Sequence, residues 1–114
     1  MDETRLPLSE YKGMWLFAMF DLPVDSADAR REYTRFRKAL LRDGFTMLQF
    51  SVYARYCPSE EASDVHRKRV RQALPPNGEV RVMSVTDHQY GKMELYLGRK
   101  RADPEEPPPQ MMLF

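Results

Sequence analysis

The longest unbroken apolar run in the chain lies near its start. Residues 14–20, MWLFAMF, contain no polar side chain, and Asp21 follows them directly. A run of this length fits a strand that is buried on both faces of a sheet. Pro23 then prevents the sheet ladder from continuing. The pattern predicts a central strand that ends in a carboxylate at the point where the chain leaves the core.

The next segment has the period of an amphipathic helix that runs to about Asp43. Asp25 and Ser26 offer side chains that can cap its N-terminus, and Gly44 is suited to the position after its C-terminus. Its apolar stripe consists of Ala29, Tyr33, Phe36 and Leu40. The pattern therefore predicts a helix that packs this stripe against the sheet.

Cations project from the side of this helix opposite the apolar stripe. They are Arg31, Arg35, Lys38 and Arg42. Such a stripe is either a solvated surface or a phosphate-binding surface. No acid lies at i+4 between these cations, so they repel one another slightly, which favours phosphate contact. A second predicted helix begins at Pro58 and Ser59, and its outward cations are Arg67, Lys68 and Arg71.

Residues 45–56 alternate in the two-residue period of strands. Leu48, Phe50, Val52, Ala54 and Tyr56 share one face of this segment. Twelve residues are long for one strand, and no Gly or Asn marks a turn. We therefore expect two strand segments joined by a bend or bulge near residues 49–51, rather than a tight hairpin turn.

The second helix and the segments after it complete the pattern. The buried side of the helix is expected to hold Ala62, Val65, Val70, Ala73 and Leu74. Residues 79–85 alternate as another strand, residues 86–89 are polar and loop-like, and a short last strand ends at Gly98. His66 falls near the apolar side, where a packed, hydrogen-bonded histidine is favoured over a catalytic one.

Composition narrows the class of protein. The chain has 114 residues, 42% of them hydrophobic and 31% charged, as in a soluble domain. No run is long enough to cross a membrane, and the first ten residues do not resemble a signal peptide. The single cysteine, Cys57, fits a reducing cytoplasm and makes a zinc site very unfavourable. Residues 14–100 hold 15 Lys and Arg against 11 Asp and Glu, and this net charge of +4 hints at a polyanionic partner.

The order of elements is strand, helix, strand (bent or double), helix, strand, followed by an extra C-terminal strand. This βαββαβ order predicts an α+β, ferredoxin-like fold with an antiparallel sheet and two helices on one face. Because the first strand is apolar on both sides, a second copy is expected to cover the other face in a symmetric homodimer.

The predicted organisation has three parts. Residues 1–13 form a flexible lead-in, residues 14–98 the ferredoxin-like domain, and residues 99–114 a basic and then Pro-rich tail. The tail ends in four apolar residues that are expected to anchor it to a partner protein: Met111, Met112, Leu113 and Phe114.

Several motifs in this order carry a family resemblance. They are the run WLFAMFDLP ending its strand in Asp21, the Arg-rich helix with Phe36 and Leu40, the pair Gly44-Phe45, and the segment QFSVY at 49–53. Over residues 14–98 the chain resembles the small CRISPR-associated endonuclease that accompanies the integrase in spacer acquisition.

The resemblance implies a homodimer that acts as a metal-dependent nuclease on double-stranded DNA or, alternatively, RNA. In that family the aspartate ending the first strand is the metal ligand, which implies Asp21 as a ligand of Mg²⁺, with Mn²⁺ as an alternative. The family's serine in the second-strand region maps onto Ser51. The resemblance also implies that the dimer bridges two integrase dimers and holds the duplex to be inserted.

The chemistry of a single aspartate limits the nuclease hypothesis. Mg²⁺ prefers near-octahedral oxygen ligands, so Asp21 alone is a poor site. A two-fold axis would bring two copies of Asp21 together, where they would repel one another unless an ion lay between them. The sequence places no obvious general base beside Asp21. We therefore expect slow, conditional cleavage.

Two other functions stay open. In a pure binding scaffold, the cations of the two helices would follow phosphates without recognising bases, and Asp21 would help to shape the dimer interface. An RNA-recognition module shares the βαββαβ order and would stack bases on Tyr53 and Tyr56. It ranks lower because FSVYARY lacks the leading basic residue and glycine of the RNP1 motif.

Overall fold

The computed structural model describes residues 13–107. The predictions for the lead-in before Gly13 and for the apolar end, Met111–Phe114, lie outside this range. The described elements are β1 (Met14–Asp21), α2 (Ala27–Arg42), β2 (Thr46–Gln49), β3 (Val52–Cys57), α3 (Glu60–Ala73), β4 (Glu79–Thr86), α4 (Asp87–Gly91), β5 (Leu95–Leu97) and β6 (Lys100–Ala102).

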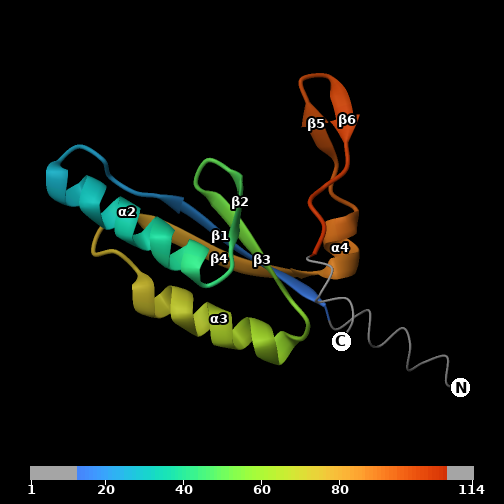
Figure 1. The fold of residues 1–114 in the computed structure, drawn as a ribbon, viewed down its shortest axis with the longest axis horizontal. Helices are drawn as coiled ribbons and strands as arrows, with labels where there is room; N and C mark the ends of the chain where they lie inside the picture. Colours follow the sequence, from blue (N-terminus) through green and yellow to red (C-terminus); the bar gives the residue numbers. More distant parts are fainter. Residues whose placement is uncertain (1–12, 108–114) are drawn as a thin grey trace, which may run out of the picture.

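The main sheet has four antiparallel strands in the order β2-β3-β1-β4. Helices α2 and α3 pack side by side on one face of it (Figure 1). This arrangement confirms the ferredoxin-like prediction, and β1 is an internal strand as expected. Its even-numbered residues face the helices, where Leu16, Phe20, Phe36 and Leu40 form the centre of the main core.

Both long helices begin where the sequence predicts, because a serine caps each of them. The Oγ of Ser26 accepts a hydrogen bond from the amide of Ala29 at 3.0 Å. The Oγ of Ser59 accepts one from the amide of Ala62 at 3.1 Å. Each cap satisfies an amide that has no partner within the first helical turn.

The segment between α2 and α3 differs from the prediction of a bend or bulge. It is a tight hairpin in which Gln49 pairs with Val52, and only Phe50 and Ser51 form the turn. Ser51 has a φ of +64°, a left-handed conformation that costs a non-glycine residue about 1–2 kcal/mol. The strain is offset because the Ser51 carbonyl accepts a hydrogen bond from the amide of Phe20 at 3.0 Å. The irregularity in register lies earlier, between Met47 and Gln49.

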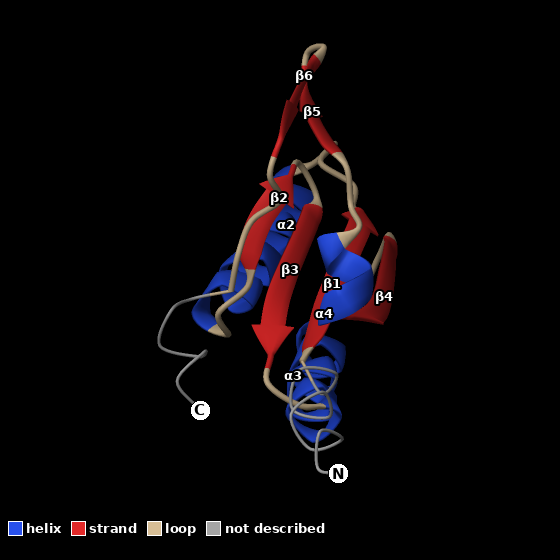
Figure 2. Ribbon diagram, turned by 90° about the vertical axis from the view of Figure 1, so that its right-hand side faces the viewer, coloured by secondary structure: helices blue, strands red, loops and turns tan. Residues whose placement is uncertain are grey.

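The outer face of the sheet, opposite α2 and α3, carries a second, smaller core. Figure 2 shows α4 lying over this face. Trp15 and Tyr90 stack there with ring centroids 3.9 Å apart. Tyr90 belongs to α4, a short helix where the sequence predicted a loop. Its N-terminus is a capping box: the Thr86 hydroxyl accepts from the Gln89 amide, and the Gln89 side chain accepts from the Thr86 amide. The chain therefore covers part of this face by itself.

The predicted last strand exists, but it does not join the main sheet. β5 pairs with β6 in a separate two-stranded hairpin that projects from the body of the molecule (Figure 1). The basic segment after Gly98 forms its turn and second strand. Two residues expected on the buried side of α3, Val65 and Leu74, are instead exposed.

Candidate functional site

Asp21 lies exposed at the C-terminal end of β1. Its register partner on β4 is Glu79, so two carboxylates stand directly opposite each other on the outer face of the sheet. Side chains in such pairs have Cβ atoms about 4.5–5.5 Å apart. Gly78, with a φ of +93°, lets the turn before β4 approach this strand end, because a Cβ there would lie 2.7 Å from the Asp21 carbonyl oxygen.

Ser51 reaches the same end of β1 from a different element. The hydrogen bond from the Phe20 amide to the Ser51 carbonyl fastens the β2–β3 turn to the residue that precedes Asp21. The fold thus brings the two predicted catalytic residues, Asp21 and Ser51, to one strand end although thirty positions separate them in sequence.

The donor set at this strand end fits Mg²⁺ as a partial site. Asp21 and Glu79 offer carboxylate oxygens, and Mg²⁺ in proteins is often held by one or two carboxylates together with water and substrate phosphates. Within residues 13–107, no group of three or more His, Cys, Asp or Glu side chains could hold a metal ion. Phosphate oxygens or a second copy would therefore have to complete the coordination.

The titratable residues of α4 are remote from this site. Asp87 and His88 follow Thr86, which is the register partner of Met14 at the opposite end of β1. The Asp87 carboxylate accepts a hydrogen bond from the Trp15 indole Nε1 at 2.7 Å, which gives it a structural role. Eight residues of strand separate the two ends, a length of about 25 Å, so neither α4 side chain can act as a base beside Asp21.

The four cations predicted on α2 line one shallow groove of about 540 Å³. Two of them also hold structural partners: Arg31 pairs with Asp28, and Arg35 pairs with Glu32 at 2.8 Å. Arg35 further donates to the carbonyl oxygen of Ala73 at the C-terminal end of α3. Acids at i−3 therefore offset part of the repulsion within the stripe.

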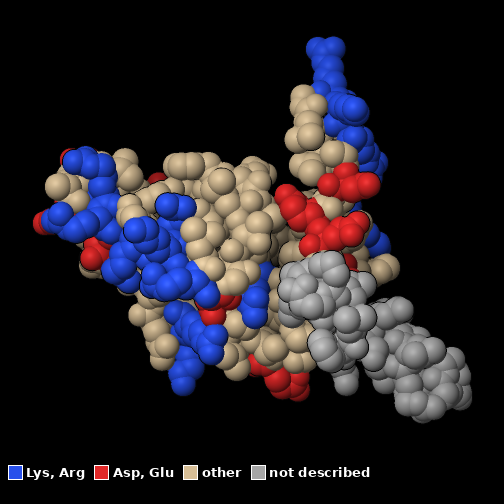
Figure 3. All heavy atoms as spheres, viewed as in Figure 1, with Lys and Arg blue, Asp and Glu red and all other residues tan. Residues whose placement is uncertain are grey.

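The cations of α3 extend this surface only in part. Lys68 and Arg71 are exposed, whereas Arg67 is half-buried and donates to the Ser84 hydroxyl at 2.8 Å. Arg67 thus ties α3 to β4 instead of pointing away, because a long side chain can reach from a helix flank to the sheet. Figure 3 shows Lys and Arg side chains gathered over α2 and α3, with others along the β5–β6 hairpin.

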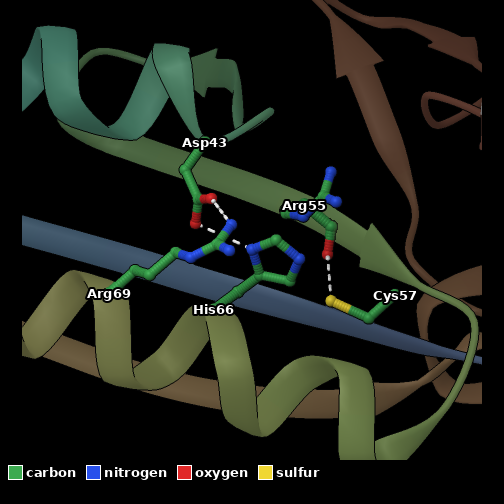
Figure 4. A network of polar contacts seen from close by, with 5 residues as sticks. All are labelled: Asp43, Arg55, Cys57, His66 and Arg69. Carbon is green, nitrogen blue, oxygen red and sulfur yellow. Dashed lines mark hydrogen bonds and ion pairs between the residues drawn. The ribbon is translucent and has the colours of Figure 1, made fainter.

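A polar network fixes the C-terminal end of α2 against α3 (Figure 4). The Asp43 carboxylate accepts from Arg69 at 2.7 Å and bonds His66 Nδ1 at 2.8 Å. His66 is buried, so the prediction of a packed, hydrogen-bonded histidine is confirmed. Cys57 is buried nearby, and burial raises the pKa of its thiol to about 11.

The structure does not place Tyr53 and Tyr56 as the RNA-recognition hypothesis requires. Tyr53 is only 1% exposed and packs on Phe20 within the main core, so it cannot stack a base. Tyr56 packs edge-on against Trp15 at 5.5 Å. Phe50, which the alternation placed on one face with Leu48 and Val52, is 79% exposed at the hairpin turn.

Sequence reasoning missed Glu79 and Phe50 as residues of this region. The order of strands could have indicated Glu79, because the fourth strand of this fold starts beside the end of the first. No signal in the sequence indicated the exposure of Phe50, since the turn interrupts an otherwise regular alternation.

Comparisons with known proteins agree with the fold. The family model for CRISPR associated protein Cas2 matches residues 14–93. The protein named CRISPR-associated endoribonuclease Cas2 from Parvibaculum lavamentivorans is 52% identical over 101 residues, 89% of this chain and 100% of that protein. The protein of the same name from Flavobacterium psychrophilum is 44% identical over 113 residues, 99% of this chain and 98% of that protein. No helix in the described part of the chain is long and apolar enough to cross a membrane.

The motifs identified in the sequence fall within the matched region. They comprise the first strand with Asp21, the Arg-rich helix α2 and the QFSVY hairpin. The antiparallel sheet with two helices on one face is the architecture that the resemblance implied. The chain therefore belongs to the CRISPR-associated protein Cas2 family, the small protein of the CRISPR adaptation module.

Proposed function

We propose that the chain is a homodimeric adaptation protein that binds double-stranded DNA, bridges integrase dimers and hydrolyses phosphodiester bonds with the help of Mg²⁺. The observation that carries the nuclease part is the exposed pair of Asp21 and Glu79 at the end of β1, with the Ser51 turn fastened beside it. The two relatives are named endoribonucleases. Their names support nuclease activity in this chain and keep RNA as an alternative substrate.

The site is open and holds two carboxylates, and the Glu79 carboxylate also pairs with the Arg81 guanidinium at 3.1 Å. When bound, Mg²⁺ would polarise a phosphoryl oxygen and make a coordinated water more acidic. Asp21 and Glu79 would hold the ion from one strand end of each copy. Ser51, in the turn beside them, would orient the nucleic acid through its hydroxyl. Since Asp87 and His88 lie at the other end of β1, the site lacks their help, and slow hydrolysis is expected.

A purely structural scaffold is the second candidate. The groove along α2 supports it, because aligned cations can follow phosphates without recognising sequence. Lys38 and Arg42 are exposed toward this groove, and they are the members that we expect to contribute most to DNA affinity. Both functions are compatible with one molecule.

Cleavage assays on purified protein separate the two candidates. Linear duplex DNA and single-stranded RNA would be incubated with Mg²⁺, Mn²⁺ or chelator over a range of pH. Asp21→Ala, Glu79→Gln, the binding variant Lys38→Ala and the wild type would run side by side, with Glu61→Gln, which changes an exposed carboxylate on α3 outside both sites, as the matched control. We expect metal-dependent cleavage that Asp21→Ala abolishes and Glu79→Gln lowers about tenfold or more.

The same variants test DNA binding without cleavage. Measured in chelator, duplex affinity should fall for Lys38→Ala and be retained by Asp21→Ala, and it should weaken with rising salt. No cleavage by any protein, with salt-sensitive binding retained, would leave only the scaffold. Equal cleavage by wild type and Asp21→Ala would refute the assignment of the metal site.

A further inference from the structure

The β2–β3 turn presents an exposed aromatic ring that the proposed mechanism does not use. Phe50 is the most exposed of the large apolar side chains in the described part of the chain, at 79%. Its ring lies nearly parallel to that of Tyr33, with centroids 6.2 Å apart and 23° between the planes. Tyr33 in turn packs edge-on against Phe20 at 6.0 Å, so the pair is anchored to the main core.

Residues of both charges surround this pair, because Asp25, Asp28 and Glu32 line a cavity on one side of Tyr33 and cations lie on the other. Arg30 and Arg37 lie three residues before and four residues after Tyr33, which places them on the same side of α2. Arg30 is oriented by a hydrogen bond from its Nη1 to the Val24 carbonyl oxygen at 3.1 Å. Aromatic faces near positive charges are a combination with which proteins bind unpaired nucleotides, because bases stack on the rings while phosphates contact the cations.

The position of Phe50 links it to the candidate site. Phe50 neighbours Ser51, and the Ser51 carbonyl accepts a hydrogen bond from the amide of Phe20. Phe20 is the residue before Asp21. Asp21 lies on the outer face of the sheet and the stacked rings lie on its helix side, so a strand held at Asp21 would pass around the end of β1 to place one of its bases on Phe50. The stacked rings also lie on the helix side of the sheet end, away from the outer face that a second copy is expected to cover.

We propose that Phe50, backed by Tyr33, is a stacking platform for an unpaired base of the nucleic acid, either in a single strand or at the splayed end of a duplex. The proposal rests on the proposed function, because it takes this base from the strand whose phosphate is held at Asp21. It assigns a substrate feature, an unpaired nucleotide near the scissile bond, that neither Asp21 nor the α2 cations would select.

Fluorescence of single-stranded oligonucleotides containing 2-aminopurine tests the platform in chelator, where cleavage cannot interfere. Wild type, Phe50→Ala and Phe50→Trp would be compared, with Met47→Ala as a matched control on the same hairpin, since Met47 is 53% exposed. We expect Phe50→Ala to weaken single-strand affinity about tenfold, equivalent to about 1.4 kcal/mol, and to abolish quenching of the probe. Phe50→Trp should retain or increase both signals.

Duplex affinity and sedimentation of the same proteins complete the test. Blunt duplex affinity should change less than about twofold in Phe50→Ala, because paired bases are not available to stack. Unchanged single-strand binding by Phe50→Ala would overturn the platform while leaving the proposed function intact. Dissociation of a dimer by Phe50→Ala, with equal losses for single strand and duplex, would also overturn it and mark Phe50 as an interface between copies. If the wild type bound no nucleic acid, the proposed function itself would fail.

Discussion

Replacing Asp43 by alanine should destabilise the protein by removing the acceptor at the centre of the network in Figure 4. The side chains of Asp43 and His66 are 12% and 11% exposed, so the His66 ring nitrogen would lose its partner in a place that water reaches poorly. An unsatisfied buried polar group costs about 1–3 kcal/mol. The Arg69 side chain is 58% exposed and can be hydrated, so its lost ion pair adds at most about 0.5 kcal/mol.

We therefore expect Asp43→Ala to lower the free energy of unfolding by about 2 kcal/mol. Arg69→Ala, which leaves the buried pair intact, is the matched control and should cost about 0.5 kcal/mol or less. Urea denaturation followed by the fluorescence of Trp15, the single tryptophan, measures both. The midpoint should fall by about 1–2 M for Asp43→Ala. Equal losses in the two variants, or a loss below about 0.5 kcal/mol in Asp43→Ala, would refute this account of the network.

Two further perturbations test other parts of the structure. Burial raises the pKa of the Cys57 thiol from 9.0 to about 11, so the unfolded chain loses this proton first. The stability that the protonated thiol contributes is therefore lost as pH rises from about 9 to 11. Urea midpoints should fall over this range more steeply in the wild type than in Cys57→Ala, and identical pH slopes would contradict the assignment. Tyr90→Ala removes the ring stacked on Trp15, so it should lower the free energy of unfolding by about 3 kcal/mol and shift Trp15 emission to the red. Tyr90→Phe loses only the hydrogen bond to Glu105 and should keep the emission of the wild type. An unshifted spectrum in Tyr90→Ala would mean that α4 does not shield Trp15.

Local signals in the sequence were sufficient for the main elements. Unbroken apolar character predicted the internal position of β1, because only a strand covered on both faces can hold such a run. Ser26 and Ser59 marked both helix starts, because a side-chain acceptor satisfies an amide within three residues of itself. The alternation of residues 79–85 likewise predicted β4.

The errors occurred where a distant contact overrides a local preference. The tight turn at Phe50 and Ser51 lacks the usual glycine. Ser51 keeps its strained, left-handed conformation because its carbonyl accepts a hydrogen bond from Phe20 of β1. Arg67 left the expected outward face because Ser84, on another element, offers an acceptor. Asp87–Gly91 forms a helix because Tyr90 can stack on Trp15, a partner more than seventy positions away.

The features of the candidate site fall into the same two groups, those that local sequence patterns predict and those that depend on contacts between distant segments. Local patterns were enough to predict the order of the main strands and long helices, the carboxylate that ends β1 and the cations along α2, because spacing along the chain sets which residues share a face. Three further features required the folded structure: Glu79 lies opposite Asp21, a hydrogen bond holds the Ser51 turn beside them, and Phe50 is exposed. These relations depend on strand register and on hydrogen bonds between distant segments, which no local period encodes.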